Sequence, residues 1–478
     1  MFLFIYDDLE YDNVWYIIRE ESKKNHGIDD EIIKHIKKNK YDLIILPDGG
    51  SNDFEYHKKI KELGCEILIL DHHIYDINKK TDAIIINNQD GQVENKDLSG
   101  CGVTYKMIDR YCELNNIDLK HKYLDLVALS LISDVCNMKS LENRYLFNLG
   151  SKVSNVSNNL IKSFIEDLKL KRKISIEDYG FGIAPILNSI IRMADIEEKE
   201  DLFESLINNE ENVEYKYRGK VVVQSISDSI LRVGKRLKRK QKDMINSVLN
   251  EELTLLNSED DKIIIIDGKE INTEIRGVVC NRLLDKYNKP VMIVSGKDVM
   301  QGSARGVDAI ELKTLCEESG LFNYCTGHLN AFGVSINKEN IDKFVNYINE
   351  KLVDVDLENY TEVDYVYEEN IPLDDMLLLK TDLEDLWCNQ IKRPKLLIKN
   401  IKINSKDIKK KGINLSFKIG DILYKKDFCS NDFYEKLIDK GNNKNIDKDL
   451  IIDTICEVKI TQNNKAYINL IETETKVV

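Results

Sequence analysis

Ile67-Leu68-Ile69-Leu70-Asp71-His72-His73 joins four apolar residues to an aspartate and two adjacent histidines. The apolar run predicts a buried β-strand, and the three polar residues then lie at its carboxyl end. Open α/β sheets bind their ligands at that edge. Imidazole beside carboxylate suits a divalent transition metal. The stretch therefore predicts an α/β fold with a metal site at the sheet edge, and the plain alternative is a surface loop with two histidines.

The flanking sequence repeats this arrangement from residue 1 to about residue 150. Short apolar runs alternate with amphipathic stretches, which favours a parallel sheet covered by helices. The expected strands are Phe2–Tyr6, Leu43–Leu46, Ile67–Leu70 and Ile84–Ile86, and the expected helices include Asp29–Lys40, Asp53–Leu63, Tyr123–Ile132 and Asn143–Val153.

Composition limits the class of protein. A chain of 478 residues predicts two to four domains. The 10 cysteines form no CxxC pair, so we expect reduced thiols and a cytoplasmic protein rather than a zinc or disulfide framework. We expect neither a signal peptide nor a membrane span. Because the net charge is −14, a nucleic-acid partner would need locally clustered Lys and Arg.

The rest of the chain divides into segments that differ in charge and in the pattern of apolar residues. Glu197–Glu252 is highly charged, lacks proline and predicts a helical connection, with a basic run at Arg232–Lys242. A second α/β unit begins near Ile263, with strands at Ile263–Asp267 and Val291–Val294. Short alternating strands near the end predict a small β-barrel or sandwich. The expected domains are 1–196, 197–262 (connecting helix), 263–352, 353–392 (acidic connector) and 393–478.

Acidic side chains follow three further apolar runs. Asp7–Asp12 follows the first expected strand, Pro47–Asp53 the second, and Asp134 closes an apolar helix. Each has an ordinary explanation alone, as a solvated turn or a helix cap. Together with His72 they supply enough ligands for two divalent ions that share carboxylates, the arrangement used for phosphoester hydrolysis.

Taken together, these motifs resemble the DHH phosphoesterase superfamily, and most of all its RecJ-type single-strand exonucleases. Asp71-His72-His73 is similar to the name-giving motif, and Glu10 and Asn13 stand where the family usually has Asp and Gly. The other matching segments are Asp8-x-Glu10-x-Asp12, Asp48, Ser99–Thr104, Ser133–Val135, Glu142–Arg144, Ile183–Pro185 with Asn188 and Arg192, Gly302–Arg305, Gly327–Gly333, and Trp387 with Pro394.

The resemblance implies two α/β lobes, DHH and DHH-associated, joined by a long helix and followed by a small OB-like barrel. It implies that Asp71 orients His72, that His73 contacts the phosphate or the leaving oxygen, and that Arg305 and His328 grip a neighbouring phosphate. Two Mn²⁺ or Mg²⁺ ions would be held by Asp8, Glu10, Asp12, Asp48, His72 and Asp134, and the substrate by Ser303, Arg305, Gly327, His328 and Asn330.

The activity so implied is 5′-to-3′ exonuclease hydrolysis of single-stranded DNA in repair, recombination or replication. A single-strand-binding protein or a helicase is a possible partner, and we expect a monomer without membrane association. Two alternatives stay open: a phosphodiesterase for short oligonucleotides or cyclic dinucleotides, and a scaffold weakened by Glu10 and Asn13. Arg232–Lys242 is either a phosphate-binding run or a solvated helix face. Three aromatic residues are either base-stacking platforms or core, namely Tyr424, Phe428 and Tyr467.

Overall fold

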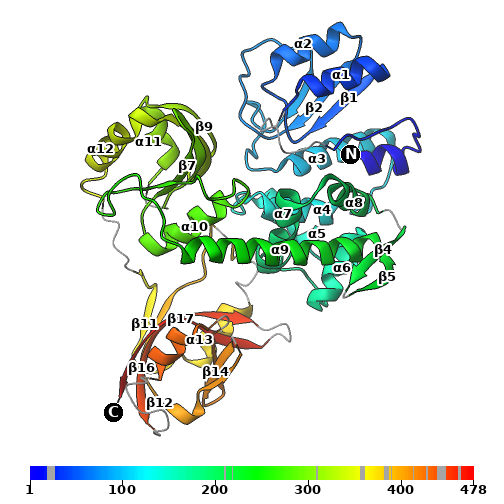
Figure 1. Ribbon diagram of the computed structural model, residues 1–478. Coiled ribbons are helices and arrows are strands. Elements are labelled where there is room, and N and C mark those ends of the chain that lie inside the picture. The colour runs from blue at the N-terminus through cyan, green and yellow to red at the C-terminus, as the bar shows by residue number, and fades with distance from the viewer. Residues whose placement is uncertain are drawn as a thin grey trace.

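A parallel sheet in the order β1-β2-β3 is formed by β1 Leu43–Pro47, β2 Glu66–Asp71 and β3 Ile84–Asn87. Strand β2 ends at Asp71, directly before His72 and His73. Helices α1 (Asp30–Asn39) and α2 (Phe54–Glu62) pack on this sheet through an isoleucine-rich core that includes Ile32, Ile60 and Ile69 (Figure 1). The structure is a computed structural model. It describes residues 1–18, 27–208, 211–217, 219–307, 310–355, 361–381, 387–388, 390–412, 414–426, 429–438, 448–460 and 465–477.

Beside this sheet, helices form the larger core of the first lobe (residues 1–206), in which Leu70 of β2 is also buried. The expected strands β1 to β3 and helices α1, α2, α4 and α5 are confirmed, with ends shifted by a few residues. The elements are η1 Phe4–Asp8, α1 Asp30–Asn39, β1 Leu43–Pro47, α2 Phe54–Glu62, β2 Glu66–Asp71, β3 Ile84–Asn87, α3 Gly100–Asn115, α4 Leu124–Ser133, α5 Leu141–Gly150, η2 Val153–Asn155, α6 Asn159–Leu168, η3 Asp178–Ile183, α7 Ala184–Met193 and α8 Ile196–Leu206.

The expected first strand, Phe2–Tyr6, is wrong, because this segment is helical and ends in the π-helical turn η1. A helical turn can place Leu3 and Phe4 together in the helical core, whereas successive residues of a strand point to opposite faces. The ring of Phe4 packs edge-on against Tyr111 of α3, with centroids 5.6 Å apart. Burial of these side chains outweighs the strand preference of an isolated apolar run.

The predicted all-helical connection is wrong in its middle. A hairpin formed by β4 Asn212–Tyr217 and β5 Lys220–Ser225 separates α8 from α9 Ile226–Asn250. The valines of β5 favour a strand because β-branched side chains fit a pleated ribbon. The long helix α9 does join the lobes (Figure 1): Ile230 is buried in the first-lobe core and Ile245 in that of the second.

The second lobe (residues 255–355) is a five-stranded mixed sheet in the order β6-β7-β8-β10-β9. Its strand β6 is parallel to β7, and the remaining pairs are antiparallel. The expected strands at β6 and β7 are confirmed. The elements are β6 Ile264–Asp267, α10 Arg276–Tyr287, β7 Val291–Ser295, β8 Val299–Arg305, α11 Leu312–Glu318, β9 Phe322–His328, β10 Ala331–Asn337, η4 Lys338–Asn340 and α12 Ile341–Lys351.

The third unit (described residues from 361 onward) is β-rich, as predicted. Seven strands pair in the order β11-β12-β16-β17-β15-β14-β13, and in the part that the structure describes no pairing between β11 and β13 closes them into a barrel. The elements are β11 Tyr365–Tyr367, α13 Leu373–Thr381, β12 Leu396–Asn404, η6 Ser405–Asp407, β13 Lys409–Lys411, β14 Asn414–Ile419, β15 Ile422–Lys426, α14 Asn431–Leu437, β16 Asp449–Ile460 and β17 Ala466–Val477.

Part of the predicted acidic connector belongs to this unit. Strand β11 pairs with β12, and Ile371 and Met376 are buried in the core of the unit. The core also holds Tyr424, which is fully buried and stacked on Phe417 at 4.9 Å. Tyr467 is buried as well, so both tyrosines are core residues rather than stacking platforms, and Phe428 lies outside the described residues. No described helix is both long enough and apolar enough to cross a membrane.

Candidate metal centre

Asp71, the last residue of β2, is a buried acceptor at the sheet edge. Its carboxylate accepts the backbone N–H groups of His72 (2.7 Å), His73 (3.2 Å) and Ser51 (3.3 Å), together with Nδ1–H of His73 (2.8 Å). Burial alone would raise the pKa of Asp71, but the hydrogen bonds from His73 and Ser51 outweigh it and hold the pKa below its usual range. Asp71 is therefore ionised and fixes the DHH turn.

His72 presents one ring nitrogen to the site. Its Nδ1 lies 3.0 Å from the carbonyl oxygen of Leu98, so this nitrogen donates and Nε2 is left as the ligand atom. Nε2 lies 3.3 Å from Oδ1 of Asp48 and 3.4 Å from Oδ2 of Asp134. Burial lowers the pKa of His72, but the two carboxylates outweigh burial and raise it overall.

The predicted role of Asp71 as the group that orients the His72 ring therefore needs correction. Asp71 bonds the ring of His73 and only the backbone of His72, whereas the Leu98 carbonyl orients the His72 ring. The hydrogen bond to Asp71 is the main cause that raises the pKa of His73. No sequence signal marks a backbone carbonyl, so this contact could not be predicted.

Asp48 reaches the site from the turn after β1. It adopts a left-handed conformation with φ 65°, and its N–H donates to the carbonyl of Leu70 at 2.8 Å. Its carboxylate lies over the first residue of α3, where a Cβ on Gly100 would come within 2.2 Å of Oδ1. A carboxylate beside a helix N-terminus is favoured by the helix dipole. Residue 100 must therefore be glycine for the Asp48 carboxylate to lie in this position.

Asp134 comes from the end of α4, where it is the C-cap residue. The following residue, Val135, has φ 53°, a conformation that costs a β-branched residue about 1–3 kcal/mol. Oδ2 of Asp134 lies 3.9 Å from Sγ of Cys136. Burial of the Cys136 thiol, together with the negative charge of Asp134, raises the pKa of Cys136 to about 12. The thiol is therefore protonated at neutral pH.

These residues fit a divalent cation. Asp48 and Asp134 offer carboxylate oxygens and His72 offers an oriented imidazole nitrogen, a donor set suited to Mn²⁺ and similar ions. One ligand atom each from Asp48, His72 and His73 also lie within 4.8 Å of one another. Segments from β1, β2 and α4 thus bring together three of the six predicted ligands.

The structure does not bring the other three predicted ligands to this cluster. Asp8 accepts hydrogen bonds from Lys122 and Tyr123, and its charge acts on Cys112 near the end of α3. Gly100 and Cys112 are separated by about 18 Å along the helix axis at 1.5 Å per residue. Glu10 and Asp12 are exposed. The ligand role of these three acidic residues stays a prediction.

In the second lobe, Arg305 is half-buried at the end of β8. Its Nη1 donates to the carbonyl of Ala304 at 2.7 Å, and a Cβ on Gly277 would come within 2.6 Å of Nη2. Burial lowers the pKa of Arg305, the thiol of Cys280 opposes this, and the positive charge of Arg192 on α7 lowers the pKa further. Arg192 belongs to the first lobe, so a positive charge of that lobe acts on Arg305 in the second.

The other predicted substrate residues lie on the neighbouring strands. Ser303 pairs with Gly333 across β8 and β10, and Gly327 has φ +130° and approaches the backbone of Ala331 too closely for a side chain. Asn330 is already engaged: its Oδ1 accepts from Leu312 N–H at 3.1 Å and its Nδ2 donates to the carbonyl of Val307 at 3.2 Å. The backbone of His328 ends β9, and its side chain lies outside the described set.

The basic run of α9 is partly engaged in intramolecular contacts. Lys235 pairs with Asp167 and Arg236 with Glu198, both acids of the first lobe. Lys238 donates to the carbonyl of Phe181 at 3.4 Å, and burial lowers its pKa. For these residues the run serves to seat α9 on the first lobe.

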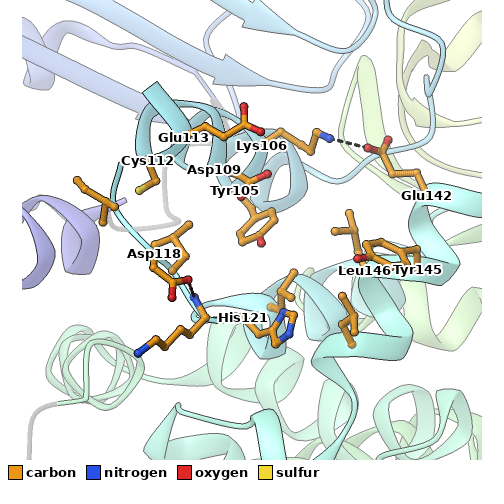
Figure 2. Close-up of a pocket in the computed structure, with 15 residues that line it drawn as sticks. Tyr105, Lys106, Asp109, Cys112, Glu113, Asp118, His121, Glu142, Tyr145 and Leu146 are labelled. Atoms are coloured by element: carbon orange, nitrogen blue, oxygen red, sulfur yellow. Dashed lines mark hydrogen bonds and ion pairs between the residues drawn. The ribbon is translucent and has the colours of Figure 1, made fainter. Parts of the chain in front are cut away.

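A pocket of about 640 Å³ opens between α3, α4 and α5 (Figure 2). Tyr105, Tyr145 and His121 line it, and Lys106 and Glu142 pair at 2.8 Å on one side. The hydrogen bonds that Glu142 accepts from Lys106 and Asn95 outweigh its burial and lower its pKa. Asp48, His72 and Asp134 are not among the lining residues, so this pocket and the metal centre are separate.

Comparison with known proteins identifies two family regions. Residues 3–131 match the DHH family, N-terminal domain, and residues 260–354 match the DHHA1 domain. The putative SPbeta prophage-derived single-strand DNA-specific exonuclease YorK of Bacillus subtilis (strain 168) is 30% identical over 473 residues, which cover 94% of this chain and 79% of that protein. The single-stranded-DNA-specific exonuclease RecJ of the same organism is 24% identical over 70% of this chain and 41% of its own length.

The fold is similar to that of solved RecJ structures. RecJ in complex with Mn²⁺ from Thermus thermophilus superposes with a TM-score of 0.66 at 16% identity, over 93% of this chain and 63% of that one. An exonuclease RecJ bound to manganese superposes with a TM-score of 0.54 at 18% identity, and the match covers 73% of this chain and 84% of that one. This chain thus spans less than two thirds of the Thermus protein, and the likeness extends over all three of its parts.

Proposed function

This chain belongs to the DHH phosphoesterase superfamily, and within it to the RecJ-type proteins, and we propose that it is a metal-dependent exonuclease acting on single-stranded DNA from the 5′ end. The observation that carries the proposal is the convergence of Asp48, His72 and Asp134, with separations of 3.3 and 3.4 Å, at the edge of the sheet. Carboxylate and imidazole ligands around a shared point are the equipment of a phosphoester hydrolase.

Mn²⁺ or Mg²⁺ is the cofactor we propose for these residues. Bound there, such an ion would activate water and neutralise phosphate charge. The chain prepares the site by fixing each ligand: Leu98 sets the tautomer of His72, and the α3 N-terminus favours the charge of Asp48. Asp71 holds His73 at the rim, where its raised pKa lets it donate a proton toward a phosphate or a leaving oxygen.

We propose that the second lobe holds a neighbouring phosphate. Arg305 supports this, because its half-buried guanidinium carries donors suited to a phosphate, and the positive charge of Arg192 in the first lobe acts on it. Gly327 belongs to the proposed substrate site through the family resemblance, and the backbone of Ala331 fills the space where its side chain would lie. Ser303 and His328 complete the proposed substrate site, and Asn330 supports it by bonding the loop backbone on either side.

The proposed substrate is a polymeric single strand, because the chain carries the long helix α9 and a third unit beyond the two lobes. A phosphodiesterase for dinucleotides needs neither. The decisive assay gives the full chain, with Mn²⁺, a 5′-labelled and a 3′-labelled single-stranded DNA beside duplex, RNA and dinucleotide substrates. Mononucleotide release from the 5′ end of single strands supports the proposal, preference for the dinucleotide contradicts it, and no cleavage at all favours a scaffold.

The ion count is a separate proposal. The cluster of Asp48, His72 and Asp134 accommodates a cation, and a second ion would need the acidic run Asp8–Asp12. Calorimetric titration of Mn²⁺ tests this, with a stoichiometry of two expected for the wild type and of one for Asp8→Asn with Glu10→Gln. A stoichiometry of one for both proteins contradicts the proposal.

A single-strand-binding protein or helicase is a further proposed partner, tested by pull-down with the purified chain.

A further inference from the structure

Cys388, Gln390 and Ile391, in the third unit, belong to a hydrogen-bonded turn that contacts the first lobe beside the proposed metal centre. The N–H of Cys388 donates to the carbonyl of Ile391 at 2.9 Å, and the N–H of Ile391 donates back to the carbonyl of Cys388 at 3.2 Å. A guanidinium nitrogen of Arg144, on α5, lies 3.7 Å from the thiol of Cys388, which packs against the first-lobe core. This closed turn is therefore seated on the first lobe, although it lies more than 240 residues farther along the chain.

Gln390 extends from this turn to the loop that follows Asp134. Its Oε1 accepts the N–H of Met138 at 3.1 Å, and its Nε2 donates to the carbonyl of Cys136 at 3.3 Å. A single side-chain amide thus satisfies one backbone donor and one backbone acceptor, as a neighbouring strand would. Both contacts are partly buried, where an unmade hydrogen bond is costly.

The loop held in this way needs support. Val135 has φ 53°, in the region that a helix C-terminus usually fills with glycine. The N–H of Val135 donates to the carbonyl of Ile132 at 3.2 Å, and the N–H of Cys136 donates to the carbonyl of Leu131 at 3.0 Å. These two hydrogen bonds attach the start of the strained turn to helix α4. Gln390 anchors the other end of the turn. A strained backbone of this kind persists only where the surrounding structure holds it.

We infer that Gln390 is a positioning residue for the metal ligand Asp134. By holding the loop 135–138 at two backbone groups, it keeps the Asp134 carboxylate 3.4 Å from Nε2 of His72. The metal centre is then completed by the third unit rather than by the first lobe alone. This inference rests on the proposed metal site, and it adds that the two hydrogen bonds of Gln390, a residue of the third unit, raise the affinity of that site.

A second contact between the same parts provides a matched control. Glu177, in the first lobe, lies 3.6 Å from Nε of Arg393 and 3.3 Å from Nζ of Lys459. Arg393 is three residues from Gln390 and also approaches the carbonyl of Val458 at 3.4 Å. Removing this contact weakens docking at a point away from the loop 135–138.

The test compares Gln390→Met, Gln390→Ala and Arg393→Met in the full chain. Methionine keeps the length and volume of glutamine and removes both hydrogen bonds. We expect Gln390→Met and Gln390→Ala to weaken Mn²⁺ binding by about 3- to 10-fold, which is below the 10- to 100-fold typical of residues that bond a ligand directly, because Gln390 acts through the loop backbone. Saturating Mn²⁺ should restore most of the nuclease rate, and Arg393→Met should bind Mn²⁺ as the wild type does.

Amide hydrogen exchange of the metal-free proteins gives a readout independent of activity. Loss of a single bond would speed exchange only at Met138, whereas loss of positioning also speeds it at Val135 and Cys136, which we expect in both Gln390 variants. Three results would each overturn the inference. The first is faster amide exchange at Met138 alone, and the second is an unchanged Mn²⁺ affinity in Gln390→Met. The third is an Mn²⁺ affinity that falls as much in Arg393→Met as in the Gln390 variants. If the wild type itself fails to bind Mn²⁺, the proposed function fails, whereas a wild type that binds no better than Gln390→Met removes only the inference.

Discussion

Nδ1 of His72 donates to the carbonyl oxygen of Leu98 at 3.0 Å, and this bond turns Nε2 of the same ring toward Asp48 and Asp134. A backbone carbonyl thus fixes both the tautomer and the orientation of this ring. A preorganised site loses little conformational entropy on binding. The site therefore depends on groups that never touch the ion as much as on those that do.

We expect His72→Gln to weaken Mn²⁺ binding by more than about 10-fold, because glutamine cannot reproduce the imidazole nitrogen held by Leu98. Differential scanning calorimetry should show that Mn²⁺ raises the Tm of the wild type but not of the variant. His35→Gln, on α1, is the control and should respond to Mn²⁺ as the wild type does. An unchanged Mn²⁺ response in His72→Gln would contradict the assignment.

Asp134→Ala should lower the rate of hydrolysis by more than about 100-fold, since even groups that only support a ligand are worth 10- to 100-fold. Binding of single-stranded DNA should stay within a few-fold of the wild type, because phosphate contacts supply most of that affinity. Nuclease assays and fluorescence anisotropy measure the two quantities. Hydrolysis retained at the wild-type rate would remove Asp134 from the site.

Gly100→Ala should displace Asp48 without unfolding the lobe. The added methyl group would lie 2.2 Å from Oδ1 of Asp48, and that side chain is 63% exposed, so it can move toward solvent. We expect weaker Mn²⁺ binding by calorimetry with a nearly unchanged Tm. Gly91→Ala has no atom within 4 Å of the added Cβ and serves as the control. Equal Mn²⁺ affinities in the two variants would show that the close approach is unimportant.

Arg305→Ala should weaken binding of single strands of every sequence alike. Loss of one phosphate contact lowers the slope of log affinity against log salt by about 1. Anisotropy titrations at several salt concentrations measure this slope. Arg276→Ala is not a suitable control, because Arg276 is buried and bonds the carbonyls of Ile271 and Gly268. Lys269→Ala, exposed on the same lobe, is suitable and should leave the slope unchanged.

Asp71→Asn should destabilise the protein in a pH-dependent manner. Hydrogen bonds lower the pKa of Asp71 in the folded state, so its stabilisation is fully present above its ordinary pKa of 3.8 and is lost as the pH falls toward the folded-state value. We expect the variant to lose about 1–3 kcal/mol of unfolding free energy at pH 7 relative to the wild type. This difference in stability should become smaller in acid. Urea denaturation at several pH values measures both. A difference independent of pH would show that the charge of Asp71 is unimportant.

Much of the proposed site was predictable because its residues lie at the ends of regular elements. Asp48 and Asp71 follow strands whose apolar runs are unmistakable, and parallel strands bring their carboxyl ends to one edge. Asp134 closes an apolar helix and could be identified in the same way. The failure at Phe2–Tyr6 has a physical reason, since a short apolar run has no periodicity that separates a strand from a buried helical turn.

The amino-acid sequence by itself determined the α/β lobes, three residues that meet at the proposed metal site, and the family, because strand patterns and motif spacing are local properties. The tertiary structure decided what depends on distant segments meeting. It decided that Leu98 rather than Asp71 orients His72, that Asp8 lies at the far end of α3, and that Tyr424 is core. It also placed Gln390 on the loop after Asp134. These contacts join residues that share no periodicity, so only the packed chain defines them.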